Sequence, residues 1–219
     1  MAKKMPSIPA EDLNRLREAL ATIYVLEDKH SVTLMHNYAW REWLQLLEAQ
    51  SHFDGLRLIS GTHGADAEAT NHSKIEFKSC KSDPLKKSGK YSQAKVKFEF
   101  DKQDKPQRRA ETLEYDGFVF AGFDKYANVV WSVLAQSKAS VNSVRVILRR
   151  KQDAFIKLLN EVYKAKGKES RDTIAVNYDD LMSISNAIYK VNGNEVTKEQ
   201  FKTFFIPPEQ RTRRKLTIS

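Results

Sequence analysis

The sequence has little cysteine and no long apolar segment. Its single cysteine, Cys80, excludes an internal disulfide framework and fits a reducing compartment. The longest hydrophobic run, Phe118 to Phe123, is far shorter than the roughly 20 residues that a membrane-spanning helix needs. The basic N-terminal residues are not followed by an apolar stretch, so no secretory signal is visible. We therefore expect a cytoplasmic protein without a membrane partner.

Motifs for nucleotide-driven chemistry and for zinc binding are also missing. The sequence has neither a GxxxxGK(S/T) phosphate-binding loop nor a dinucleotide fingerprint. Its five histidines show no zinc-ligand spacing with the lone cysteine. Because no histidine partner is evident, Cys80 is better interpreted as a small packing residue than as a nucleophile.

Positive charge is in excess in this sequence. Lys and Arg number 37 against 28 Asp and Glu, which gives a formal net charge of +9. A basic domain is the usual electrostatic footprint of nucleic-acid binding, but a well-solvated surface has a similar composition. A membrane surface is a weaker candidate partner, because no helix combines a basic face with a strongly apolar one. Charge alone leaves nucleic-acid binding and simple solvation open.

The chain is predicted to form one α/β domain over residues 1–219, with a central mixed, mostly antiparallel sheet flanked by helices. Leucines spaced by three and four predict that residues 1–50 are helical. Alternating and continuous apolar runs place the sheet in residues 55–135. Residues 140–219 are expected to be helical, with a basic C-terminal end.

Four segments of the C-terminal part carry more detailed predictions. Val141–Leu148 fits a strand or a helix, whereas Gln152–Lys166 fits a helix that ends at a glycine. Ile174–Val176 is a candidate strand, and Asp180–Tyr189 is predicted to be helical.

The most informative stretch is GADAEATNHSKIEFKSCK, residues 64–81. In an extended chain Ile75 and Phe77 point to one face, while Glu76 and Lys78 point to the other. Two ionised groups on an internal strand are costly unless they are paired or solvated. One solution is a salt bridge at the rim of the sheet. The other is a catalytic cleft, in which a divalent cation and a phosphate occupy the space between the two groups.

Asp66 makes the catalytic interpretation more attractive. It follows a glycine turn, so the chain can bring its carboxylate back beside Glu76. Two convergent carboxylates suit Mg²⁺, and Lys78 could hold an attacking water and neutralise the scissile phosphate. Asp66 and Glu76 are thus candidate metal ligands, and all three residues are candidate catalytic groups. Glu68 and His63 are secondary candidates for support of the same site.

The pattern resembles the PD-(D/E)xK nuclease superfamily, and in detail the PvuII-type restriction endonucleases. Those enzymes carry a Gly-any-Asp-Ala turn, then nine residues, then Glu-Leu-Lys-Ser. The present chain has Gly64-Ala65-Asp66-Ala67, nine intervening residues, and Glu76-Phe77-Lys78-Ser79. The close match covers only about 25 residues, and the histidine cluster that follows the active strand in PvuII-type enzymes is absent.

The resemblance implies a restriction-endonuclease-like fold and Mg²⁺-dependent cleavage of double-stranded DNA by a homodimer. It assigns Asp66 and Glu76 as metal ligands and Lys78 as the catalytic lysine. A type II restriction endonuclease of this kind is expected to have a cognate DNA methyltransferase acting on the same site. Two alternatives remain, a structure-selective nuclease of repair or recombination and a non-catalytic basic DNA-binding protein.

Three regions are candidate interaction surfaces. The first helices, which carry Trp40 and Trp43, are the expected dimer surface. The loop after the active strand and the basic C-terminal tail could each contact DNA, although a solvated loop and a solvated tail have the same composition. The candidate DNA-binding residues are Lys86, Lys87, Lys90, Tyr91, Ser92, Gln93, Arg211, Arg213 and Arg214.

Overall fold

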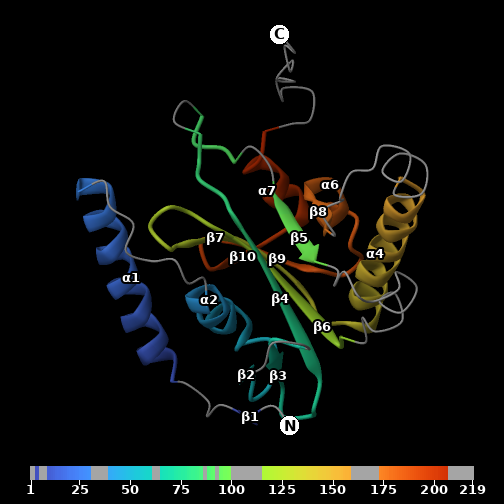
Figure 1. Ribbon diagram of the computed structural model, residues 1–219, viewed down its shortest axis with the longest axis horizontal. Coiled ribbons are helices and arrows are strands. Elements are labelled where there is room, and N and C mark those ends of the chain that lie inside the picture. Colours follow the sequence, from blue (N-terminus) through green and yellow to red (C-terminus); the bar gives the residue numbers. More distant parts are fainter. Residues whose placement is uncertain are drawn as a thin grey trace, which may run out of the picture.

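The computed structural model describes residues 3–4, 9–30, 39–60, 65–85, 88–91, 94–99, 115–158 and 173–206. In this part of the chain, helices pack against both faces of a mixed sheet (Figure 1). The predicted fold class, one α/β domain around a mostly antiparallel sheet, is confirmed. None of the helices described has the length and apolar surface that crossing a bilayer requires.

The main sheet has the strand order β1-β2-β3-β4-β6-β7-β9-β10. Its strands are β1 (Lys3–Lys4), β2 (Arg57–Ser60), β3 (Ala67–Glu68), β4 (Lys74–Lys81), β6 (Gly117–Phe123), β7 (Val129–Ala135), β9 (Ile188–Val191) and β10 (Asn194–Val196). Strands β4 and β6 pair in parallel, and the other neighbours pair antiparallel. The central strand β6 is buried throughout because both of its faces are covered, as its continuous apolar run predicted.

A separate two-stranded ribbon lies beside the main sheet. It consists of β5 (Lys95–Glu99) and β8 (Thr173–Asn177), which pair antiparallel. Val96 and Phe98 are buried, whereas Lys95 and Lys97 are exposed, so the predicted alternation of β5 is confirmed. The ribbon covers part of one face of the main sheet next to β4.

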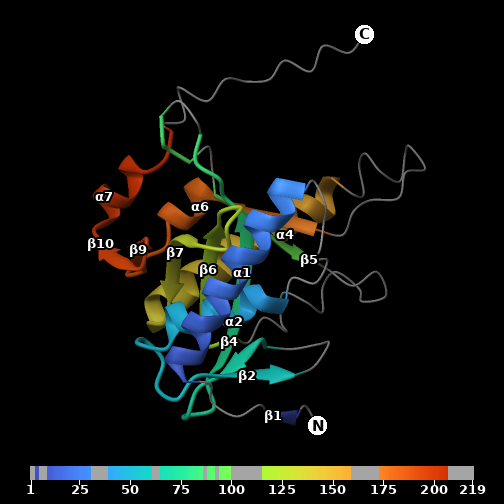
Figure 2. The same ribbon diagram turned by 90° about the vertical axis from the view of Figure 1, so that its left-hand side faces the viewer.

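Two N-terminal helices cover the opposite face. They are α1 (Ala10–His30) and α2 (Ala39–Ala49), and α1 lies outside α2 (Figure 2). Leu46 of α2 belongs to the same buried cluster as Ile75 and Phe77 of β4. Trp43 is partly buried against this cluster, so its indole contributes to the core. The side chain of Trp40 lies outside the described part of the chain.

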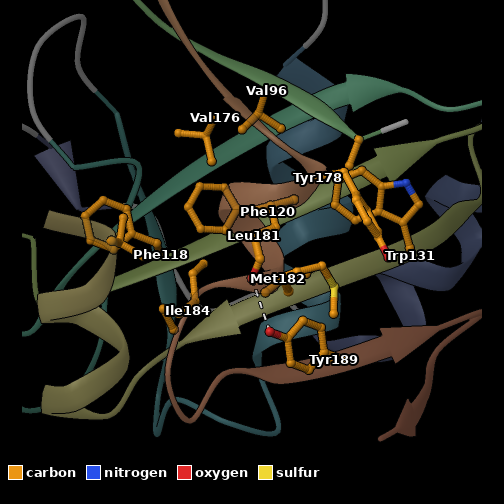
Figure 3. Close-up of a cluster of buried hydrophobic side chains, with 14 of the residues drawn as sticks. Val96, Phe118, Phe120, Trp131, Val176, Tyr178, Leu181, Met182, Ile184 and Tyr189 are labelled. Atoms are coloured by element: carbon orange, nitrogen blue, oxygen red, sulfur yellow. Dashed lines mark hydrogen bonds between the residues drawn. The ribbon is translucent and has the colours of Figure 1, made fainter. Parts of the chain in front are cut away.

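The second core lies between the main sheet and the C-terminal elements. These are α4 (Lys138–Leu158), α6 (Tyr178–Met182), α7 (Lys198–Thr203) and the β5–β8 ribbon. Figure 3 shows Phe120 of β6 beside Leu181 of α6, with Phe118 on the far side of Phe120. The dashed line marks the 3.1 Å hydrogen bond that the Tyr189 hydroxyl donates to the Leu181 carbonyl oxygen. Aromatic packing thus holds the short C-terminal helices on the sheet.

Helix α4 corrects one predicted boundary. It runs without interruption from Lys138 to Leu158, so it includes the ambiguous Val141–Leu148 segment and the start of the predicted 152–166 helix. Val144 and Leu148 are buried on one face of the helix, which identifies their spacing as helical. The predicted strand at Ile174–Val176 is confirmed as part of β8.

The predicted helix over residues 180–189 is wrong in its second half. Helix α6 ends at Met182, and residues 188–191 form strand β9. A hairpin turn at Asn192 and Gly193, with φ of 49° and 78°, joins β9 to β10. Asn-Gly suits such a turn because both central residues have positive φ. The 140–219 segment therefore contributes strands as well as helices.

Candidate active site

The candidate site lies where β3 and β4 separate. The Asp66 amide donates to the Ile75 carbonyl oxygen at 3.0 Å, and Oδ2 of Asp66 accepts a 2.6 Å hydrogen bond from the Phe77 amide. Regular pairing of the two strands covers only Ala67 with Ile75 and Glu68 with Lys74. The Asp66 side chain therefore continues the ladder by one bond, which brings its carboxylate to the level of Glu76.

The face of β4 that carries the candidate residues holds a close ion pair. Ile75 and Phe77 point into the core, with 0% and 4% exposure, as the alternation predicted. On the other face, Nζ of Lys78 pairs with Oε1 of Glu76 and donates to the Phe77 carbonyl oxygen at 3.1 Å. The Lys78 ammonium also lies 5.4 Å from the centroid of the Phe98 ring on β5, so the ribbon covers this face.

Carboxyl groups outnumber ammonium groups around this pair. Asp66 and Glu76 perturb each other, and both act on the charge of Lys78. Glu76 is 6% exposed, and its carboxylate also interacts with the side chains of Asp66 and Tyr115. The site therefore has an excess of negative charge when its acids are ionised.

The pKa values of all three groups are raised. Burial is the main cause for the two acids, and the two acids are the cause for Lys78. Burial raises the pKa of Glu76 to about 7, although Lys78 opposes the shift, and Asp66 adds to it. Burial also raises the pKa of Asp66, against the effects of Lys78 and of the Phe77 amide. Burial alone would lower the pKa of Lys78, but Glu76 and Asp66 outweigh it and raise the pKa. The lysine is thus held in its charged form, and the acid pair favours binding of a proton or another cation.

Glu42 is a candidate residue that the sequence analysis missed. It lies in the first turn of α2 and is exposed, yet partial desolvation and Asp66 raise its pKa, while Lys78 lowers it. Gln45, one turn later, donates from Nε2 to the Lys78 carbonyl oxygen at 3.2 Å. No local spacing signals this proximity, because it arises only when α2 packs on the sheet.

The two secondary candidates have different outcomes. Glu68 lies opposite Arg57 in the β2–β3 pair, and its Oε1 is 3.0 Å from Nδ1 of His72. Glu68 therefore lies within hydrogen-bond distance of an exposed histidine, at the end of β3 that is farther from Asp66. His63 lies outside the described residues.

The candidate DNA contacts are only partly described. Lys90 is exposed, which is compatible with phosphate contact. Tyr91 is 7% exposed, and the centroid of its ring lies 5.8 Å from that of Phe205 in the core, so the structure places this side chain mainly in packing. The other candidates lie outside the described residues, namely Lys86, Lys87, Ser92, Gln93, Arg211, Arg213 and Arg214.

Cys80 behaves as a packing residue, as predicted. It is half-buried against the core on the same face as Lys78. Burial raises the pKa of its thiol, and a hydrogen bond with the Lys95 backbone opposes the shift. The contact shows that the start of β5 lies next to β4.

Asp66 and Glu76 provide hard oxygen ligands of the kind that Mg²⁺ prefers. Within the part of the chain that the structure describes, no three His, Cys, Asp or Glu side chains converge as a complete metal site. Two carboxylates with the remaining positions left to waters and substrate oxygens is a usual arrangement for Mg²⁺ in phosphate chemistry. The residues present therefore fit a magnesium ion.

Comparisons with known proteins give no further guide to this site. No family model matches the chain, and no curated protein has a significantly similar sequence.

Proposed function

We propose that the protein is a Mg²⁺-dependent nuclease that hydrolyses phosphodiester bonds of double-stranded DNA. The observation that carries this proposal is the buried acid pair of Asp66, the residue before β3, and Glu76 of β4, which lies beside Lys78. A simple salt bridge accounts for Lys78 and one carboxylate only. The second carboxylate favours binding of a proton or of a further cation such as Mg²⁺, because a buried uncompensated charge is costly.

The roles of the residues follow from their positions. Mg²⁺ held by Asp66 and Glu76 would act as a Lewis acid on the scissile phosphate. Lys78 carries a positive charge beside this pair, so it is suited to neutralise charge on the phosphate and to orient an attacking water. Phe98 shields the Lys78 ammonium on one side, which strengthens its electrostatic interactions.

Double-stranded DNA is the proposed substrate because of charge and resemblance. The chain has a net charge of +9, and the exposed Lys95 and Lys97 lie on β5 next to the catalytic strand. The spacing of Asp66, Glu76 and Lys78 resembles that of PvuII-type restriction endonucleases. On that resemblance we propose type II restriction activity by a homodimer, with a cognate methyltransferase that protects the same site.

A digest of unmodified phage DNA with Mg²⁺ tests the proposal. Discrete fragments support a site-specific enzyme, whereas a smear or cleavage of branched DNA alone supports a structure-selective nuclease. Binding of DNA in EDTA without cleavage in any divalent metal would leave only a DNA-binding protein. The Glu76→Gln variant, purified identically, controls for contaminating nucleases.

A further inference from the structure

A buried glutamine connects α2 with the backbone of Lys78. Gln45 is 1% exposed, and its Nε2 donates to the carbonyl oxygens of Lys78 at 3.2 Å and Val119 at 2.9 Å. These two acceptors belong to β4 and β6, the parallel pair at the centre of the sheet. One side chain therefore joins a helix to two strands at the position of the candidate catalytic lysine.

Packing alone does not require an amide at this position. The neighbouring side chains, Leu44 and Leu46, are apolar and 1% and 0% exposed. Burying an amide costs free energy unless it is hydrogen-bonded, and an aliphatic residue of similar volume would avoid that cost. Hydrogen bonds depend on angle as well as distance, so a hydrogen-bonded amide holds the helix in one orientation on the two strands.

Two groups of the candidate site depend on this orientation. The Lys78 backbone is held by Gln45, while its ammonium is held by Glu76 and lies over the Phe98 ring. Glu42 is three residues before Gln45, so both lie on the same side of α2. Glu42 acts electrostatically on Lys78 and on Asp66.

We infer that Gln45 is a positioning residue of the active site. Its two hydrogen bonds set Lys78 and Glu42 in their places relative to the Asp66–Glu76 pair. The inference rests on the proposed nuclease function. Small displacements of reacting groups lower turnover more than they lower substrate binding, so the predicted defect lies in kcat.

The first experiment compares Gln45→Met with Leu46→Met. The first variant keeps the side-chain volume but removes the donor, and the second makes a volume-conserving change at the adjacent buried position. Circular dichroism and urea unfolding establish that each variant is folded. Gln45→Met should lower kcat for DNA cleavage by about 10- to 100-fold with KM little changed. Leu46→Met should retain the wild-type kcat.

A wild-type kcat in folded Gln45→Met would overturn the inference and leave the nuclease proposal intact. If Gln45→Met does not fold, Gln45→Asn provides the same comparison, because its amide is one methylene shorter and cannot reach both carbonyl oxygens. We expect Gln45→Asn to show a kcat below that of the wild type and an altered environment of Lys78.

The second experiment does not depend on catalysis. Acylation of lysines by an amine reagent, read by peptide mass spectrometry, compares Lys78 with Lys74 and Lys81 on the same strand. Lys78 is largely covered and ion-paired, whereas the two reference lysines are exposed, so Lys78 should react more slowly in the wild type. The Gln45→Met variant should raise Lys78 labelling several-fold relative to the references, and Leu46→Met should not.

The two experiments separate the two proposals. An unchanged labelling ratio in Gln45→Met overturns the positioning role whether or not the wild type cleaves DNA. A raised ratio in a protein that cleaves no DNA with any divalent metal would reject the nuclease function. In that case Gln45 would still be shown to place Lys78.

Discussion

Asp66 supplies through its side chain the hydrogen-bond acceptor for the Phe77 amide, with Oδ2 and the nitrogen 2.6 Å apart. The carboxylate thereby takes the position of a backbone carbonyl at the end of the β3–β4 ladder. Its orientation beside Glu76 is fixed by backbone geometry, and the strand pairing itself creates the acid pair. Asparagine retains an acceptor for the same bond, which makes Asp66→Asn a test of charge with little effect on structure.

We expect the three isosteric changes Asp66→Asn, Glu76→Gln and Lys78→Met each to lower kcat for DNA cleavage by at least about 1,000-fold. Each removes a charge that the proposed mechanism uses. DNA affinity, measured by fluorescence anisotropy with Ca²⁺, should stay within a few-fold of the wild type. Lys74→Met, an exposed change on the same strand, is the matched control and should cleave normally. Normal cutting by Lys78→Met would contradict the mechanism.

The central strands could be predicted because the spacing of apolar residues in the sequence matches the burial of those residues in the structure. Strand β4 alternates between core and site residues, and β6 is apolar throughout because both of its faces are covered. The β9–β10 hairpin was missed although Asn192-Gly193 is a strong turn signal. The sequence predicted one helix over residues 180–189. Because α6 ends at Met182 and β9 begins at Ile188, this predicted helix covered the start of β9, and the strand was not predicted.

Part of the candidate site could likewise be predicted from the sequence, and part could not. Asp66, Glu76 and Lys78 could be grouped from sequence because two adjoining strands fix their relation over a short stretch. Glu42 and Gln45 could not, since their contacts with the site depend on how α2 packs on β4 and β6. The packing of Tyr91 could not be predicted because its partner Phe205 is distant in the sequence.

Glu42→Gln should weaken the response to Mg²⁺ without abolishing cleavage. Glu42 adds negative charge near Asp66 and Lys78, so its loss reduces the attraction for a cation. Because Glu42 is exposed, solvent screens part of its charge, and a change of about 0.5 kcal/mol would raise the Mg²⁺ concentration for half-maximal cleavage about twofold. Glu11→Gln, an exposed change on α1, should leave the magnesium titration unchanged. Identical titrations for Glu42→Gln and the wild type would exclude Glu42 from the site.

Mg²⁺ should also stabilise the folded protein in the absence of DNA. A ligand that binds only the folded state at 100 times its Kd adds about 2.7 kcal/mol to the free energy of unfolding. Urea unfolding at rising Mg²⁺ concentration should therefore show a higher midpoint for the wild type. Asp66→Asn and Glu76→Gln should lose the effect, whereas Lys74→Met should keep it. Equal stabilisation of all four proteins would indicate binding elsewhere on the chain.

The pH dependence of stability distinguishes a cation site from a simple salt bridge. Burial raises the pKa of Glu76 from its ordinary value of 4.5 to about 7 in the folded state. The folded protein therefore holds this proton more tightly than the unfolded chain. The resulting stabilisation is complete below about pH 4.5 and is lost as the pH rises through 7.

The loss amounts to about 3 kcal/mol at most, because one pKa unit corresponds to about 1.4 kcal/mol. Glu76→Gln is neutral at every pH and lacks this contribution. Urea unfolding of both proteins between pH 5 and 8 measures the contribution of Glu76 together with its coupling to Asp66 and Lys78, since titrating groups outside the site contribute similarly to each. We expect the wild type to lose stability relative to Glu76→Gln as the pH rises, and Mg²⁺ at pH 8 to restore it. A wild type that instead gains stability relative to the variant would mean that the ion pair with Lys78 dominates, which would favour the salt-bridge interpretation.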